Sequence, residues 1–219
     1  MDFDIIKQTL PLYWEAAKVT LTLGIVGICL SVLLGFFFGL ISYFKIPILQ
    51  KIVGIYISLA RNTPLLIQLY FLYYGFPKIG LPIGKNSAAI LGLTFLGAAY
   101  MAEAFRGSFE TVPAVQLESG RSLGFTKWQL AKVVIFPQGL PQSIPSLGAN
   151  CIFLLKETSV FSAISIMDLT NTAKDLIGMY YMTREFLLLL VISYALITLP
   201  MILVINLIER RVRRANYGV

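Results

Sequence analysis

The sequence predicts an all-α integral membrane protein with about five transmembrane helices, and two observations support this prediction. Of the 219 residues, 57% are hydrophobic and 13% are charged, a composition that a soluble domain would struggle to keep in solution. The apolar residues also gather in long runs, and a spanning helix needs about 20 mostly apolar residues. We therefore expect a single transmembrane domain that comprises residues 1–219.

Five segments are long and apolar enough to be spans. They begin near Glu15, Ile52, Ser87, Ile144 and Phe186 and end near Phe44, Phe76, Phe109, Met167 and Ile208, respectively. The opening MDFDIIKQTL is acidic and lacks the basic start of a removable signal peptide. We expect the first helix to remain in the mature protein.

The basic residues outside the spans predict the orientation, because basic flanks tend to stay in the cytoplasm. With the N-terminus outside and the C-terminus inside, the inner flanks hold Lys45, Lys51, Arg106, Arg121, Lys127, Lys132, Arg210, Arg211, Arg213 and Arg214. The outer flanks then hold fewer, namely Lys7, Lys18, Lys78, Lys85, Lys174 and Arg184. The net charge of +7 is explained by this topology and by anionic lipid headgroups, so no nucleic-acid partner is expected.

The first two spans carry features of helix packing. Gly27, Ser31, Gly35 and Gly39 recur every four residues and form a stripe of small side chains that suits close packing within the bundle. In the second span, Pro64 of the stretch RNTPLL should kink or break the helix. A break at membrane depth is tolerated only where protein or a water-filled cavity satisfies the freed backbone groups. We expect this segment to face the bundle interior.

A polar stretch of roughly 30 residues, about 110–140, separates the third and fourth spans, which is long for a helix connection. Gln116 to Leu123 predict a short helix that Gly124 ends, and Phe125 to Val134 predict a second helix. Three prolines are expected to reset the chain before the fourth span, namely Pro137, Pro141 and Pro145. Apolar side chains available as anchors in a partner's groove are Leu117, Leu123, Phe125 and Trp128.

Several kinds of chemistry are excluded by composition. Histidine is absent, which removes the usual general base and the commonest zinc ligand. Cys29 and Cys151 stand singly, without ligand spacing, so no metal site is expected. Gly80 and Gly84-Lys85 resemble a phosphate-binding loop, but the spacing is one residue short and Asn86 follows the lysine. We expect no nucleotide site, no bound cofactor and no enzymatic activity in this chain.

The polar stretch resembles a known element, the cytoplasmic EAA loop of ATP-binding-cassette (ABC) importer permeases. The matching residues are Glu118, Ser119, Gly120, Gly124 and Phe136-Pro137. The stretches ARNTPLLIQLYFLYYGFP, YMAEAFRGSFETVP and FLLKETSV are similar to the polar amino acid permease subfamily. One departure is that Ser119-Gly120 replaces the alanine pair, and glycine weakens a helix by about 1 kcal/mol relative to alanine.

The resemblance implies the type I ABC importer fold and a multi-pass protein of the bacterial cytoplasmic membrane, embedded in membrane lipid. A separate ATPase subunit with ATP and Mg would drive alternating access through the loop. Further implied partners are a second permease subunit, identical or related, and an extracytoplasmic amino acid binding protein. The residues implied in ATPase coupling are Glu118, Ser119, Gly120, Gly124, Phe125 and Trp128.

Polar groups at membrane depth are the candidate substrate contacts, because such groups are costly and usually face a cavity. The candidates are Gln68, Glu103, Arg106, Lys156, Glu157, Ser159 and Ser162. Glu103 and Arg106 could instead pair with each other, and the serines could be ordinary interhelical hydrogen-bonding groups. Arg61 is expected to support the broken second span more often than to touch ligand.

An alternative is a stand-alone secondary transporter or channel that uses Glu103 or Glu157 for ion coupling. A self-sufficient carrier would not need the partner-docking loop, which favours the importer. A membrane enzyme or scaffold is the weakest hypothesis, since no nucleophile has an evident base. The identity of the amino acid stays open among cationic, polar neutral and disulfide-linked ligands.

Overall fold

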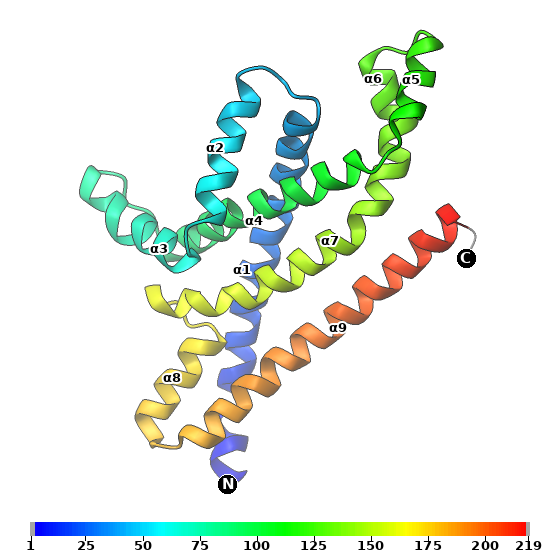
Figure 1. Ribbon diagram of the computed structural model, residues 1–219. Coiled ribbons are helices and arrows are strands. Elements are labelled where there is room, and N and C mark those ends of the chain that lie inside the picture. The colour runs from blue at the N-terminus through cyan, green and yellow to red at the C-terminus, as the bar shows by residue number, and fades with distance from the viewer. Residues whose placement is uncertain (1–2, 218–219) are drawn as a thin grey trace.

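A computed structural model describes residues 3–217, and all regular secondary structure in this part of the chain is helical (Figure 1). The α-helices are α1 (Phe3–Tyr43), α2 (Leu49–Arg61), α3 (Leu65–Tyr70), α4 (Lys85–Glu110), α5 (Ala114–Ser122), α6 (Lys127–Leu130), α7 (Phe136–Glu157), α8 (Leu169–Tyr180) and α9 (Thr183–Tyr217). Short π- or 3₁₀-helical segments are η1 (Phe71–Gly75), η2 (Phe76–Ile79), η3 (Ala131–Ile135) and η4 (Thr158–Ile164). Four of the described helices are long and apolar enough to cross a membrane, or five spans result if one bent pair is counted as a span. The predicted all-α membrane fold is confirmed.

The bent pair is the predicted second span. It consists of Leu49–Arg61 and Leu65–Ile79, which meet at 103°. The break falls at Pro64, as its missing N–H and its steric restriction of the preceding residue predict. With 13 residues, α2 is only about 20 Å long, so it ends before crossing a hydrocarbon core of roughly 30 Å.

The centre of the bundle is the crossing of α1 and α4. A Cβ atom on Gly39 would lie 2.9 Å from the Cβ of Phe105, and one on Gly27 would lie 2.8 Å from Leu93 Cδ2. The small-residue stripe of α1 therefore packs directly on α4, as predicted, and the two backbones approach closely because the glycines lack side chains.

The fourth span differs from the prediction. The helix is continuous from Lys127 to Ile164, so the expected start near Ile144 is wrong, as is the expected end of a separate loop helix at Val134. Pro141 and Pro145 lie inside α7, and Pro137 follows the π-helical segment η3. The wide π turn makes room at Val133, the carbonyl with which the ring of Pro137 would otherwise clash.

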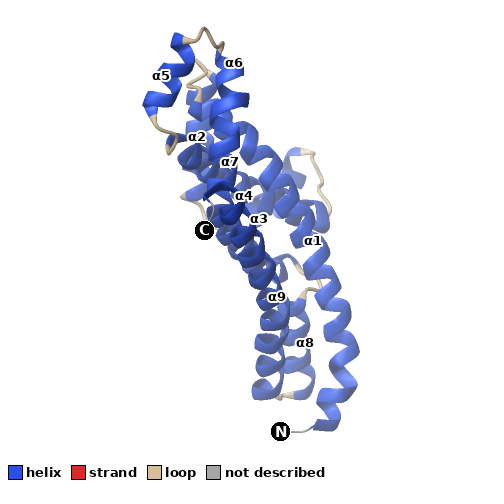
Figure 2. Cartoon of the chain, turned by 90° about the vertical axis from the view of Figure 1, so that its right-hand side faces the viewer, coloured by secondary structure: helices blue, strands red, loops and turns tan. Residues whose placement is uncertain are grey.

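Helix α8 is an element that the sequence analysis missed. It packs with the N-terminal parts of α1 and α9 in a second apolar cluster built from Tyr13, Ala16, Leu169, Ala173, Leu176 and Phe186. The Tyr13 hydroxyl donates to the Phe186 carbonyl at 2.9 Å. Figure 2 shows these three helix ends together at one end of the molecule, opposite α5 and α6.

Candidate functional site

Two cavities lie end to end along α2 and α4. The first, here the loop-side cavity, has a volume of about 550 Å³ and is lined by Ser42, Lys45, Gln50, Gly54, Ile57, Ser58, Arg61, Asn62, Tyr100, Glu103, Arg106 and Glu110. The second, the distal cavity, has a volume of about 510 Å³ and is lined by Arg61, Asn62, Thr63, Pro64, Leu65, Leu66, Leu96, Tyr100, Phe153, Glu157 and Val160. Arg61, Asn62 and Tyr100 line both cavities and so mark the boundary between them.

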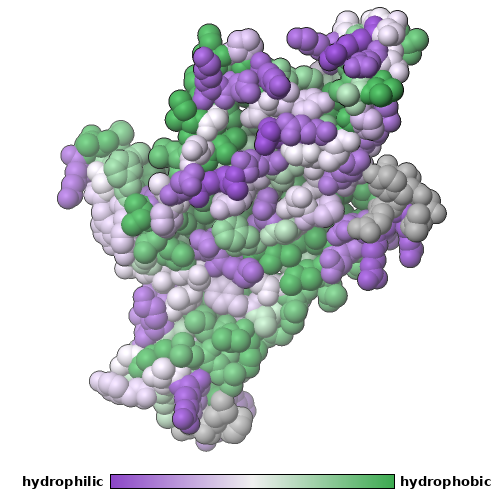
Figure 3. Space-filling model, viewed as in Figure 1, coloured by the Kyte–Doolittle hydropathy of each residue, from purple (hydrophilic) through white to green (hydrophobic). Residues whose placement is uncertain are grey.

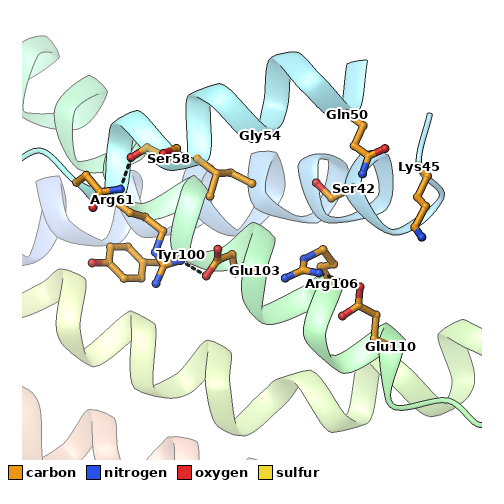
Figure 4. Close-up of a pocket in the computed structure, with 12 residues that line it drawn as sticks. Ser42, Lys45, Gln50, Gly54, Ser58, Arg61, Tyr100, Glu103, Arg106 and Glu110 are labelled. Carbon is orange, nitrogen blue, oxygen red and sulfur yellow. Dashed lines mark hydrogen bonds and ion pairs between the residues drawn. The ribbon is translucent and has the colours of Figure 1, made fainter. Parts of the chain in front are cut away.

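An ion pair occupies this boundary (Figure 4). The Arg61 guanidinium donates to the Glu103 carboxylate and also lies over the Tyr100 ring, 5.0 Å from its centroid. The other neighbour of that ring is Phe153, at a centroid distance of 5.2 Å. Charge pairing and the cation–π contact both offset the cost of a cation at membrane depth.

The break in the second span places Arg61 there. Arg61 is in the last turn of α2, where the negative end of the helix dipole favours a cation. Successive carbonyls of this turn accept side-chain hydrogen bonds: Ser58 from Asn62 Nδ2 at 2.7 Å and Leu59 from Thr63 Oγ1 at 2.9 Å. Two of the carbonyls at the helix end are thereby satisfied by nearby side chains.

Gln68 also stabilises the end of α2 at the break. Its buried amide donates to the Ala60 carbonyl at 3.1 Å and to Thr63 Oγ1 at 2.9 Å. Gln68 lines neither the loop-side nor the distal cavity. The amide of Gln68 thus holds the bend, and Gln68 also lines a third, mainly apolar cavity of about 750 Å³.

The charged candidates on α4 have separate partners. Glu103 pairs with Arg61, while Arg106 donates to Glu110 one turn further along the helix, at 2.8 Å. The possible Glu103–Arg106 pair is therefore wrong. Glu103 pairs with the residue that is more distant in the chain because the guanidinium of Arg61 projects from the broken helix toward it (Figure 4). Local spacing in the sequence could not reveal that partner.

Glu157 is the carboxylate of the distal cavity. It is half-buried at the end of α7, and no ion pair to it is seen among the side chains that the structure describes. Its neighbour Lys156 is exposed and lines neither cavity. Ser159 and Ser162 lie on η4, where the Ser162 hydroxyl donates to the Ser159 carbonyl at 3.1 Å, and they too lie outside both cavities.

Sequence reasoning missed Tyr100 as a cavity residue and gave Arg61 and Asn62 mainly a structural role. Tyr100 stands three residues before Glu103, which places both on one face of α4. That spacing was an available signal. Within the described range, no three Cys, Asp or Glu side chains gather to hold a metal ion.

The polar loop forms a compact pair of short helices at one end of the molecule. Gly120 is buried, and a Cβ there would overlap the side chain of Leu130. Gly124 follows α5 at φ +82°, as expected of a glycine terminator. α6 starts at a capping box, in which the Thr126 N–H donates to Gln129 Oε1 at 2.8 Å.

The proposed loop anchors divide into two groups. Leu123 is 76% exposed and Trp128 is 66% exposed, whereas Leu117 is half-buried against the main core and Phe125 lies beside Gly120. Glu118 and Ser119 are exposed on α5. Leu123 and Trp128 are thus the anchors that project from this loop.

The hydropathy of the surface agrees with this arrangement. In Figure 3, hydrophilic side chains form a band over the region where α2 and α4 lie, and the surface over the middle of α9 is mainly hydrophobic. The most apolar 18-residue stretch within the span Thr183–Val212 has a mean hydropathy of 2.7, and none of its residues is buried. This helix therefore presents most of its surface to lipid or to another membrane subunit.

Comparisons with known proteins agree with one another. A family profile described as "Binding-protein-dependent transport system inner membrane component" matches residues 31–214. The chain is 33% identical to the probable amino-acid permease protein YxeN of Bacillus subtilis (strain 168), over 96% of this chain and 95% of that protein. It is 28% identical to the glutamine transport system permease protein GlnP of Escherichia coli (strain K12), over 97% and 98% of the two chains.

Solved structures show the same likeness. The crystal structure of an amino acid ABC transporter with histidines matches with a TM-score of 0.90 and 32% identity, over 96% of this chain and 99% of that chain. An inward-facing MetNI methionine ABC transporter matches with a TM-score of 0.72 and 21% identity, over 92% and 98% of the chains, and so shares the fold.

Proposed function

Because the chain belongs to the binding-protein-dependent transport system inner-membrane component family, as the permease subunit of an amino-acid ABC importer, we propose that its distal cavity holds the amino acid in transit. ATP is hydrolysed in such importers by a separate ATPase subunit, so the permease supplies only the transport pathway. Family membership also sets aside the stand-alone secondary transporter and the channel.

The observation that carries the proposal is a carboxylate, Glu157, that lines a cavity of about 510 Å³ without an ion-pair partner among the described side chains. A substrate ammonium or cationic side chain would supply that partner. The substrate carboxylate would approach Arg61, whose guanidinium has five N–H donors and so retains some beyond its bond to Glu103.

The orientation follows from the partners in this proposal. Leu123 and Trp128 on the loop dock to the ATPase subunit, with the implied coupling residues Glu118, Ser119, Gly120, Gly124 and Phe125 around them. The ATPase is cytoplasmic, so the loop-side cavity faces the cytoplasm and α8 lies toward the outer surface. The N-terminus is then outside and the C-terminus inside, and the extracytoplasmic binding protein delivers the amino acid from the α8 side to a pair of permease subunits.

Uptake by the complete importer tests the substrate site. The permease, its ATPase and its binding protein are reconstituted in proteoliposomes, and ATP-driven uptake of labelled amino acids is measured for the parental chain and for Glu157→Gln. We expect the variant to raise the KM for uptake by about tenfold or more, since one charge-assisted contact contributes roughly 1.5–3 kcal/mol.

Asp175→Asn is the matched control. It makes the same carboxylate-to-amide change on α8, at an exposed position that lines neither cavity. Uptake by Glu157→Gln with the parental KM for every amino acid that the parental importer carries would contradict the proposed site.

A further inference from the structure

The two cavities meet at three residues that line both, namely Arg61, Asn62 and Tyr100. Along α4, residues 103, 106 and 110 line the loop-side cavity alone, Leu96 lines the distal cavity alone, and Tyr100 lines both. Along the broken second span, Gly54 and Ser58 lie on the loop side and Leu65 and Leu66 on the distal side. The partition is at the same level on both helices.

Arg61 and Tyr100 lie in this partition, and Glu103 holds Arg61 from the loop side. Arg61 and Glu103 have side chains that are 37% and 36% exposed, so the pair is open to the cavities rather than sealed in the core. Tyr100 is supported from behind by Phe153. An interaction between half-exposed charges on two different helices can be broken and remade without unfolding either helix, because screening keeps such a pair weak.

We propose that the Arg61–Glu103 ion pair, with the Tyr100 ring against it, is the gate between the distal cavity and the loop-side cavity. This proposal deepens the proposed function and rests on it, because it assigns the distal cavity to the substrate and the loop side to the cytoplasm. The closed gate is the arrangement seen in Figure 4.

The chemistry of the substrate suits such a gate. A carboxylate that arrives in the distal cavity is the same chemical group as the side chain of Glu103 and competes with it for the Arg61 guanidinium. Arg61 can therefore be held by Glu103 in the empty protein and by the substrate in the loaded one. Opening then needs no new charge at membrane depth, only an exchange of carboxylates.

Cysteine accessibility in the complete importer tests the gate. Cys29 and Cys151 are first replaced by serine, and Val160→Cys reports on the distal cavity while Gly54→Cys reports on the loop-side cavity. No side-chain or distant backbone atom lies within 4 Å of a Cβ built at Gly54, so that reporter fits its site. A membrane-impermeant maleimide is added to inside-out vesicles without ATP, and labelling of this chain is followed over time.

We expect fast labelling of Gly54→Cys and slow labelling of Val160→Cys, because a closed gate that opens for roughly 0.1–10% of the time slows access by about tenfold or more. Glu103→Gln should raise the Val160→Cys rate by about tenfold or more. The exchanged pair Arg61→Glu with Glu103→Arg should return it toward the slow parental value, a rescue that a loosened helix would not show. If Glu103→Gln fails to assemble, Arg61→Gln breaks the same pair from the other helix and is read in the same way.

Glu110→Gln is the matched control, since it breaks the Arg106–Glu110 pair on the same helix and in the same loop-side cavity. Its Val160→Cys rate should equal the parental rate. The gate is overturned if Val160→Cys is labelled quickly with the pair intact, if Glu103→Gln leaves the rate unchanged, or if Glu110→Gln raises it equally. The labelling needs no transported amino acid, so the gate can fail while Glu157-dependent uptake persists, and uptake can fail to depend on Glu157 while the gate holds.

Discussion

At the scale of single residues, Asp168 shows how burial changes chemistry outside the spans. Its side chain is fully buried at the start of α8, where Oδ1 accepts the Asn171 N–H at 2.9 Å. Burial raises the pKa of Asp168 from 3.8 to about 6, although the N–H groups of Asn171 and Thr170 oppose the change. The folded protein thus binds a proton at Asp168 more readily than the unfolded chain does.

This pKa predicts a stability that depends on pH. Because the folded pKa is raised, the stabilising contribution is complete below about pH 4 and is lost as the pH rises through about 6. The pKa difference corresponds to roughly 3 kcal/mol in the free energy of unfolding. Asp168→Asn keeps a side-chain oxygen for the cap but cannot ionise, so the variant should be the more stable protein at pH 7.5.

Thermal unfolding in detergent checks this prediction. The advantage of Asp168→Asn should shrink as the pH falls from 7.5 toward 4, while all other titrating groups behave alike in the two proteins. Parallel melting curves across this pH range would show that Asp168 does not carry the effect.

Single residues also show what a sequence can reveal about a site. Glu103, Arg106 and Glu157 were identified as candidates because charge at membrane depth is costly wherever it falls. The partner of Glu103 was not identified, because Arg61 is 42 residues away in the chain and only the broken helix brings it near. Local spacing predicts only local pairs, such as Arg106–Glu110.

At the scale of elements, the α1–α4 crossing depends on missing side chains. A Cβ at Gly35 would overlap the Cβ of Met101, an atom fixed to the backbone that no rotamer change can move. Gly35→Ala should therefore destabilise the protein by about 1–3 kcal/mol, the usual cost of overpacking.

Gly107→Ala on α4 is the comparison for that measurement, since no side-chain or distant backbone atom lies within 4 Å of a Cβ built there. Alanine is favoured over glycine inside helices by roughly 0.5–1 kcal/mol, so this variant should melt at or above the parental temperature in the same detergent. A fall of equal size in both variants would show that the overlap with Met101 is not the cause of the destabilisation.

Some helices could be predicted from the sequence and others could not. Long apolar runs indicated the spans, and Pro64 indicated the break, because both signals are local. The prolines of the fourth span led to a wrong prediction of where its helix starts. The π turn Ala131–Ile135 accommodates Pro137, so the helix continues through this region. α8 was missed because its 12 residues are too few to span and become a helix mainly by packing against α1 and α9.

At the scale of the whole molecule, the exposed loop anchors lie at the end farthest from α8 (Figure 2). If this end docks to the ATPase subunit, Leu123→Ala and Trp128→Ala should each weaken that association by roughly ten- to a hundredfold, as expected for apolar anchors that fill a partner's groove. Binding of the detergent-solubilised permease to the purified ATPase subunit measures the effect.

Tyr181→Ala provides the reference for this measurement, because Tyr181 is 89% exposed and directly follows α8 at the opposite end. Its affinity for the ATPase subunit should equal that of the parental chain. Loss of affinity at Tyr181 but not at Leu123 and Trp128 would place the docking surface elsewhere.

The Arg61–Glu103 pair also has a consequence for how the chain is inserted into the membrane during synthesis. Arg61 leaves the ribosome 42 residues before Glu103, and a cation alone at the middle of a membrane helix costs about 2.5–3.5 kcal/mol on insertion scales. The half-length α2 cannot offset that cost by itself. We therefore expect the broken second span to stay beside the insertion machinery until α4 has been synthesised, so that the two enter the bilayer together.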